Sequence, residues 1–321
     1  MPGARDTTPG VLRHRPVMLK EAVDALAVKP GGRYVDGTLG RAGHAREIIA
    51  RGGVVLGVDR DDQALREVEA LRAEGGLEGL TAVKGRHGDI AAIAGAAGWE
   101  SVDGILLDLG VSSPQLDEAG RGFSLLRDGP LDMRMDRSSG LTAADVVNTW
   151  SAERLEEAFR RWGEEPGARR LARAIAAERE PRPFRTTVQL ADFVAGVLGR
   201  RGAHHPATRV FQALRMAVND EAGELERALA GGFGLLADGG RFVVITFESL
   251  SDRVVKRAFA AHVGRMASLQ GGGARWEGGL PRATPAVKGA VKPTAAEVEA
   301  NPRSRSAKLR AVEVTRKGKS E

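Results

Sequence analysis

Short apolar segments alternate with helical segments along the first third of the chain, and this alternation restricts the fold more than any other feature. Two apolar segments, Arg33–Asp36 and Val54–Asp59, each end in an acid, and two more follow at Leu80–Val83 and Asp103–Leu107. Between the second and third, Asp61–Ala73 carries apolar residues at helical spacing. Because neighbouring parallel strands need helical crossovers, the pattern predicts a doubly wound α/β sheet.

A long gap separates the fourth of these strands from the next one, Arg241–Phe247. Roughly 130 residues lie between them, whereas a crossover needs about a dozen and long loops without secondary structure are rare. Ser151 and Thr187 are suited to cap segments with apolar residues at helical spacing. We therefore predict a core in two parts, 1–115 and 206–321, interrupted by a helical insert at 116–205.

Three expectations concern the second part of the core. One long helix after Pro206 should pack against the sheet. Residues 271–293 are rich in Gly and Pro and should form a flexible, lid-like loop. Residues 306–315 alternate between apolar and polar, which predicts a further strand, with an edge position as one alternative.

The composition limits both chemistry and location. The chain has no cysteine, which excludes disulfides, thiolate metal sites and a cysteine nucleophile. No metal is expected, because the sequence offers no convincing cluster of ligands. No apolar run reaches the length of a bilayer span and the N-terminus lacks a secretory signal, so we expect a cytoplasmic protein without membrane contact.

The chain is basic, with a net charge of +6 and a pI of about 9.9, which suits a polyanionic partner. Basic residues are concentrated in 167–185, 200–215 and 288–321. A solvated surface is the alternative for any one of these clusters, but together they favour nucleic acid. Aromatic residues make up only 4% of the chain, so recognition should depend on phosphates and shape more than on extensive stacking.

A glycine-rich turn, Asp36–His44, lies between a predicted strand and a predicted helix. Glycines there allow a tight turn and a close approach of the backbone to a ligand. Asp59 ends the next strand, where a carboxylate can accept hydrogen bonds from both hydroxyls of a ribose. NAD and S-adenosylmethionine both fit this arrangement, but the spacing of Gly37, Gly40 and Gly43 departs from the pattern of dinucleotide sites.

A second polar motif, Asp108–Gln115, follows the fourth strand. The carboxyl ends of parallel strands meet at one edge of the sheet, which places Asp108 beside Asp36 and Asp59. Amino-methyltransferases carry a short Asp/Asn-Pro-Pro-aromatic motif at this place, which holds the target amine. A carboxylate that accepts an N–H helps a conjugated amine to pyramidalise for in-line attack on a sulfonium methyl, where positioning supplies much of the rate. A turn capped by Asp108 is the alternative.

Several long motifs together resemble a single family. They are Asp-Gly-Thr-Leu-Gly at 36–40, the segments 106–117, 121–124 and 128–136, the segment 205–215, and Asn-Pro-Arg-Ser-Arg-Ser at 301–306. From His14 to about Val314 the chain is similar to the bacterial small-subunit ribosomal RNA cytosine-N4 methyltransferases, called RsmH or MraW. The resemblance implies a seven-stranded, Rossmann-like, S-adenosylmethionine-dependent methyltransferase core with an inserted helical domain. It implies methylation of N4 of a cytidine in the decoding region of 16S ribosomal RNA, within the small subunit or its precursor.

The resemblance also implies roles for individual residues. Ala42, Gly43 and His44 would contact the cofactor, Asp59 would hold its ribose, and the ends of the cofactor would be lined by His87, Asp108 and Gln115. To these we add Asp36, Gly37 and Gly40 as cofactor residues, Asp108 with Ser112 and Ser113 as catalytic residues, and Arg134 and Arg209 as clamps for phosphate or carboxylate. The alternatives are a core or helix-surface position for His44 and plain surface charges for the two arginines.

Three residues depart from the family pattern. Ala42 stands where the family usually has glycine, His87 where it usually has Phe, and Glu248 where it typically shows His. The departures bear on adenine stacking at His87 and on any imidazole role at Glu248. No residue is predicted to be a strong general base.

Three other functions remain open from the sequence. They are an NAD-dependent oxidoreductase with the same fold, a methyltransferase for a protein amine, and a non-catalytic RNA-binding or assembly factor. The oligomeric state is also open, with a homodimer as one alternative.

Overall fold

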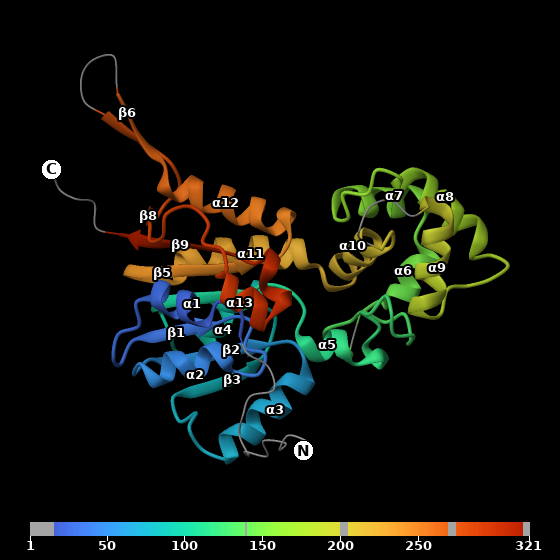
Figure 1. Ribbon diagram of the computed structural model, residues 1–321. Coiled ribbons are helices and arrows are strands. Elements are labelled where there is room, and N and C mark those ends of the chain that lie inside the picture. Colours follow the sequence, from blue (N-terminus) through green and yellow to red (C-terminus); the bar gives the residue numbers. More distant parts are fainter. Residues whose placement is uncertain (1–15, 139, 200–204, 269–273, 317–321) are drawn as a thin grey trace.

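The computed structural model describes residues 16–138, 140–199, 205–268 and 274–316. Within these ranges one sheet is built from β1 Arg33–Asp36, β2 Val54–Asp59, β3 Leu80–Lys84, β4 Val102–Asp108, β5 Leu236–Thr246, β8 Arg282–Pro285 and β9 Lys308–Thr315. The seven strands lie in the order β3-β2-β1-β4-β5-β9-β8 (Figure 1). β1 to β5 are parallel, and β9 runs antiparallel to both β5 and β8. The predicted doubly wound, seven-stranded sheet is confirmed.

Helices cover both faces of the sheet. Successive side chains of a strand point to opposite faces, so a strand that is apolar throughout leaves two apolar faces to be covered. Tyr34 and Leu106 point into one apolar layer, and their neighbours Val35 and Ile105 point into the other. The first layer is closed by α1 Leu19–Leu26, α2 Gly43–Ala50 and α3 Asp62–Ala73, and the second by α4 Ile90–Ala96, α11 Glu221–Leu235 and α12 Ser249–Val263. The strand order reverses between β1 and β4, and ligands of such sheets bind at the carboxyl strand ends beside this point.

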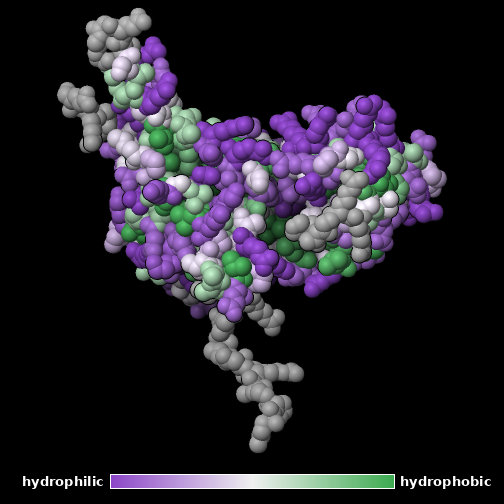
Figure 2. Space-filling view, turned by 45° about the horizontal axis from the view of Figure 1, so that its top comes forward, coloured by the Kyte–Doolittle hydropathy of each residue, from purple (hydrophilic) through white to green (hydrophobic). Residues whose placement is uncertain are grey.

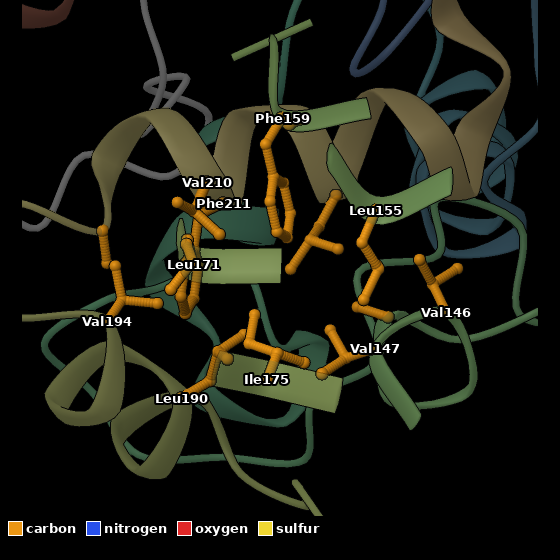
Figure 3. Packing of buried hydrophobic residues seen from close by; sticks show 14 of the residues in the cluster. Val146, Val147, Leu155, Phe159, Leu171, Ile175, Leu190, Val194, Val210 and Phe211 are labelled. Carbon is orange, nitrogen blue, oxygen red and sulfur yellow. The ribbon is translucent and has the colours of Figure 1, made fainter. Parts of the chain in front are cut away.

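The insert is a helical unit beside the core (Figure 1). Its helices are α6 Ala143–Thr149, α7 Ala152–Arg161, α8 Ala168–Glu178, α9 Thr187–Leu198 and α10 Thr208–Asn219. Their apolar sides meet in a hydrophobic cluster separate from the two layers of the sheet (Figure 3). Ser151 caps α7 as predicted, but the cap of α9 is Thr186, whose side chain accepts from the Gln189 N–H, and Thr187 is already the first helical residue.

The single long helix expected after Pro206 is two helices. Asp220 lies between α10 and α11 with φ of 51°, in the left-handed region, and this residue ends α10 and turns the chain into α11. Val210 and Leu214 of α10 belong to the cluster of the insert, so the expectation that they pack against the sheet was wrong. Of the two helices, α11 is the one that covers the sheet.

Residues 286–293 have no helix or strand beyond a bridge at Val291, as expected of a loop, but the loop expected at 271–293 is wrong for the earlier described part, 274–285. This part contains β7 Ala274–Glu277 and β8, and β7 pairs with β6 Arg265–Ser268 in a two-stranded ribbon that projects from the core (Figure 1). β9 lies between β5 and β8, not at the edge of the sheet.

The remaining elements are short and lie mostly around the carboxyl ends of the strands. They are η1 His87–Asp89, α5 Ser113–Asp117, η2 Ala119–Arg121, α13 Ala295–Ala300 and η3 Pro302–Ser306. Across the described ranges, every helix falls short of the apolar length that crossing a membrane requires.

Candidate functional site

A cavity of about 200 Å³ opens at the carboxyl ends of β1, β2, β4 and β5. Residues of α5 and η3 line it as well, and Figure 2 shows the surface hollowed between the core and the insert. The predicted site residues that line the cavity are Gly37, Gly40, Gly43, His44, Asp59, His87, Asp108, Ser112, Ser113 and Gln115. The fold therefore brings the glycine turn, the acid of β2 and the Asp108 motif to one place. Their individual roles stay predictions.

The glycine turn is held tightly against β4. The Gly37 N–H donates to Leu106 O (2.9 Å), and a Cβ on Gly37 would lie 2.5 Å from Leu107 Cδ2, so a larger residue does not fit without a shift. Ala42 has φ of 57° and precedes the first residue of α2. It is buried and absent from the cavity lining in the described part of the chain, so its predicted cofactor contact has no support from the geometry.

Asp59 faces the glycine turn from the end of β2. Its two oxygens accept hydrogen bonds from the backbone N–H groups of Gly40 (2.7 Å) and Asp61 (2.9 Å). Burial raises the pKa of Asp59, and these two hydrogen bonds oppose the rise. Each carboxylate oxygen has a second lone pair, so Asp59 can fix the turn and still present acceptors to the hydroxyls of a ribose.

Asp36 and Asp108 end the neighbouring strands β1 and β4, and Thr38 connects them. The Thr38 N–H donates to Asp36 Oδ1 (3.1 Å), and Thr38 Oγ1 accepts from the Asp108 N–H (2.6 Å). Burial raises the pKa of both carboxyls to about 7, helped by the charge of Asp59 near Asp36 and of Asp36 near Asp108. Asp108 Oδ1 is buried and has no hydrogen-bond partner among the described residues. The Asp108 side chain is 23% exposed and lines the cavity, so its carboxylate can offer an acceptor to a ligand, with Oδ1 reaching it after a small rotation of the side chain.

Two histidines of the cavity lie in different surroundings. His44 is buried, with Nε2 at 3.1 Å from Val17 O and Nδ1 at 3.9 Å from Asp108 Oδ2. His87 has its pKa lowered by burial to about 4, so its imidazole is neutral near pH 7. Its Nε2 is buried and finds no hydrogen-bond partner in the described ranges.

Ser112 and Gln115 form a capping box at the start of α5. Ser112 Oγ accepts from the Gln115 N–H (3.4 Å), and the Ser112 N–H donates to Gln115 Oε1 (3.0 Å). Gln115 Nε2 also donates to Asp61 Oδ2 (2.9 Å). These contacts hold the segment after Asp108 in place. The catalytic roles of Ser112 and Ser113 and the cofactor contact of Gln115 stay predictions.

The two predicted substrate arginines do not belong to the cavity lining within the described ranges. Arg134 is paired with the Asp132 carboxylate through Nε (2.8 Å) and Nη2 (3.0 Å). Arg209 is exposed on α10. Any phosphate that they bind would therefore lie outside the cavity.

Arg121 is a cavity residue to which the sequence analysis gave no role. It is 3% exposed, and its guanidinium contacts Asp61 Oδ2 (2.8 Å) and the carbonyl oxygens of Arg134 (3.2 Å) and Met135 (3.1 Å). It thereby joins the core to the insert at the wall of the cavity. Its position in the segment Arg121–Ser124, one of the motifs that resemble the family, could have identified it from the sequence.

Glu248, which stands where the family typically has His, forms an ion pair in the structure. Arg215 of α10 lies between Glu221 of α11 (2.7 Å) and Glu248, two residues after β5 (3.0 Å). Glu221 also lines the cavity. The carboxylate at position 248 is therefore used in an ion pair that holds the junction of α10, α11 and β5.

The comparisons with known proteins agree with this geometry. The model described as the MraW methylase family matches residues 11–315. The chain belongs to this family. The ribosomal RNA small subunit methyltransferase H of Symbiobacterium thermophilum is 45% identical in an alignment of 319 positions that covers 93% of this chain and 96% of the relative. Its counterpart in Thermomicrobium roseum is 48% identical over 304 residues, which cover 94% of this chain and 93% of the relative.

Solved structures are more distant. An rRNA methylase from Streptococcus thermophilus matches 95% of this chain and 99% of its own length, with 11% identity and a TM-score of 0.40. The fold is established by the strand order of the chain itself.

Family membership confirms a methyltransferase with S-adenosylmethionine as cofactor. The cavity fits this molecule, because its sulfonium and ammonium groups are cationic and the carboxyls of Asp36, Asp59 and Asp108 lie in or behind the cavity wall. Asp108 Oδ1 and His87 Nε2 are buried polar atoms without partners in the described chain, as expected of a wall that meets a polar ligand. No group of three or more His, Asp or Glu residues that could hold a metal ion occurs in the described ranges.

Proposed function

We propose that this protein transfers the methyl group of S-adenosylmethionine to N4 of a cytidine in the decoding region of 16S ribosomal RNA. The observation that carries the proposal is the Asp108 carboxyl, which lines the cavity and whose Oδ1 has no hydrogen-bond partner among the described residues. The names of the relatives support ribosomal RNA of the small subunit as the substrate class. N4 and the decoding region rest on the resemblance of the motifs.

The residues of the cavity divide the task. The glycine turn and Asp59 bind the nucleoside part of the cofactor, and the bound cofactor supplies an electrophilic methyl group. The Asp108 carboxylate accepts an N–H of the target amine and directs the nitrogen lone pair, which is otherwise delocalised into the cytosine ring. Positioning of this kind supplies much of the rate of an in-line transfer. The methylated amine is acidic enough to lose its proton to water, so a strong general base is not required.

Nucleoside mass spectrometry of 16S ribosomal RNA tests this function. A deletion strain should lack N4-methylation at one cytidine of the decoding region, and the wild-type gene should restore it while a gene encoding Asp108→Ala should not. Unchanged RNA modification in the deletion strain would overturn the proposal and favour a protein amine as the substrate. Full restoration by Asp108→Ala would instead favour a non-catalytic assembly role.

Binding of the cofactor is expected to release protons near pH 7. Asp36 and Asp108 have pKa values of about 7 in the free protein, so each is about half protonated there. A cationic ligand favours the ionised carboxylate and lowers the pKa, which drives protons off. Titration calorimetry at pH 7 in phosphate and in Tris, which differ in ionisation enthalpy, should therefore give different binding enthalpies, and the difference should shrink above pH 8. Equal enthalpies in both buffers at pH 7 would contradict this expectation.

We propose that the insert recognises RNA and that it extends to Asp220 instead of ending at 205. α10 supports this boundary, because its apolar residues belong to the cluster of the insert. The basic residues of 167–185 include Arg169, Arg170 and Arg173, which are exposed on α8 and take part in no ion pair of the described ranges. Arginines with free guanidinium groups suit phosphate contacts, which position RNA without reading its sequence. Residues 200–204 of the second basic cluster lie outside the described residues.

Removing these three arginines together is expected to weaken RNA binding and its dependence on salt. Each lost phosphate contact should reduce the slope of log K against log salt by about 0.7–0.9. Fluorescence anisotropy with a labelled 16S fragment at several salt concentrations measures the slope. Arg72→Ala, an exposed arginine of α3 in the core, is the matched control and should leave it unchanged. An unaltered slope in the triple variant would remove α8 from the interface.

The resemblance also supports a substrate within the small subunit or its precursor, and therefore action in the cytoplasm where these particles are assembled. Comparing free 16S RNA, precursor particles and small subunits as methyl acceptors tests the first point. The proposed homodimer is tested by sedimentation, with and without RNA.

A further inference from the structure

Several apolar residues of the cavity lining have no part in the proposed cofactor contacts. They include Leu109, Val111, Met135, Leu225 and Phe247. Phe247 follows β5 directly, and among the described lining residues it is the one with a phenyl, phenol or indole ring. The segment Asp108–Val111 contains no aromatic residue. Any aromatic surface beyond the two histidines must therefore come from the end of β5.

The pairing of β4 with β5 places Phe247 beside Asp108. Asp108 lies opposite Ile245, and the next residue, Leu109, donates its N–H to Ile245 O (2.9 Å). Phe247 lies two residues beyond Ile245, against Gly110. A Cβ built on Gly110 would lie 3.2 Å from Cδ2 and 3.5 Å from Cε2 of the Phe247 ring. The absence of a side chain at Gly110 is thus what lets the ring lie against this loop.

Phe247 is not fully used by the hydrophobic core. It is half-buried and packs at the margin of the layer that holds α1, α2 and α3. The aromatic pairs found among the described residues involve Phe184, Phe193, Phe233, Phe242 and Phe259, with His262, and Phe247 takes part in none of them. A partly exposed ring near an unpartnered carboxylate suits a planar group with an N–H edge.

We propose that Phe247 is the surface on which the target base stacks, with Asp108 at the edge of that base. The inference rests on the proposed function and deepens it. A base that leaves its RNA helix loses stacking on its neighbours, and an aromatic side chain in the enzyme restores part of that loss. Stacking fixes the plane of the ring, whereas the Asp108 contact fixes its rotation within that plane. Together they direct the exocyclic nitrogen toward the methyl group.

Phe247→Leu is the direct test, because leucine keeps an apolar side chain and removes the flat ring. With small subunits as substrate, kcat/KM for methyl transfer should fall by about 5- to 150-fold, the range for loss of one base–aromatic stack. The Kd of S-adenosylmethionine should stay near the wild-type value. Phe247→Tyr, which keeps the ring, should retain most of the activity. Trp99→Leu, which removes a similarly half-buried ring from the core at a position outside the cavity lining, is the matched control and should leave kcat/KM unchanged.

Gly110→Ala provides a second, independent perturbation if the leucine variant folds poorly. Its Cβ would approach the Phe247 ring to 3.2 Å and, at φ of 151°, would also strain the loop, so the ring should be displaced while its chemistry is kept. The same selective loss in kcat/KM is expected.

The outcomes separate the inference from the function on which it rests. If the wild-type protein methylates no ribosomal RNA, the proposed function fails. If the wild type is active and Phe247→Leu transfers methyl groups as fast, the stacking role is wrong. A parallel loss of cofactor affinity in Phe247→Leu would also overturn it and assign the ring to the cofactor.

Discussion

Replacing Asp108 with alanine is expected to lower kcat for methyl transfer by about 10²- to 10³-fold, as loss of a positioning or charge-stabilising group in an active site commonly does. The Asp108 Oδ1 atom is the buried acceptor at the switch point that has no partner among the described residues. Without it, the amine nitrogen loses the contact that directs its lone pair. The Asp108 N–H still donates to Thr38 Oγ1 in the variant, so the glycine turn should hold. Single-turnover transfer from labelled S-adenosylmethionine measures the effect.

Asp108→Asn is the matched control for this experiment. It keeps one oxygen acceptor of the same shape and removes the charge, so its kcat should lie between the wild type and Asp108→Ala. The Kd of the cofactor, measured by calorimetry, should change much less than kcat in both variants, since Asp59 and the glycine turn remain. If cofactor binding is lost in proportion to kcat, Asp108 is a cofactor ligand and does not orient the amine.

The sequence predicted the sheet well because buried parallel strands carry continuous apolar runs that stand out locally. The break between α10 and α11 was missed for a physical reason. Apolar residues continue at helical spacing from Val210 to Leu229, and nothing in that spacing marks Asp220. The break depends on distant contacts, since Asn219 Nδ2 donates to Met133 O (2.8 Å) and Asn219 Oδ1 accepts from the Met135 N–H (2.9 Å). Local periodicity carries no information about such a contact.

At the candidate site, too, features set by local sequence could be predicted, and features set by distant contacts could not. The strand-end acids were predicted because parallel strands bring their carboxyl ends to one edge whatever the rest of the chain does. Phe247 and Arg121 contribute through strand register and through contacts between core and insert, which spacing does not reveal. Ser112 and Gln115 are an intermediate case. Ser-x-x-Gln at the start of a helix is a capping-box pattern, so the structural use of both side chains could have been predicted from residues 112–115 alone but was not.

The Asp59→Ala variant is expected to lose most of its affinity for the cofactor. Two hydrogen bonds from ribose hydroxyls to a charged acceptor would vanish, and each is worth about 1.5–3 kcal/mol. Taken together they correspond to a rise in Kd of about 10²- to 10⁴-fold. The loss should exceed that of a simple ligand contact, because Asp59 also accepts the backbone N–H groups of Gly40 and Asp61 and so shapes the turn. Titration calorimetry with S-adenosylmethionine measures the Kd.

Asp59→Asn separates these two contributions. An asparagine oxygen can accept one of the two backbone N–H groups, but its amide nitrogen then faces the other as a second donor, so the turn is strained even though the side chain keeps its size. Its Kd should therefore lie close to that of Asp59→Ala. Asp62→Ala, which removes an exposed acid three residues away that pairs with Lys84, controls for the change in charge and should bind the cofactor normally. A wild-type Kd in Asp59→Ala would mean that the ribose lies elsewhere, and the assignment of the cavity to this cofactor geometry would be wrong.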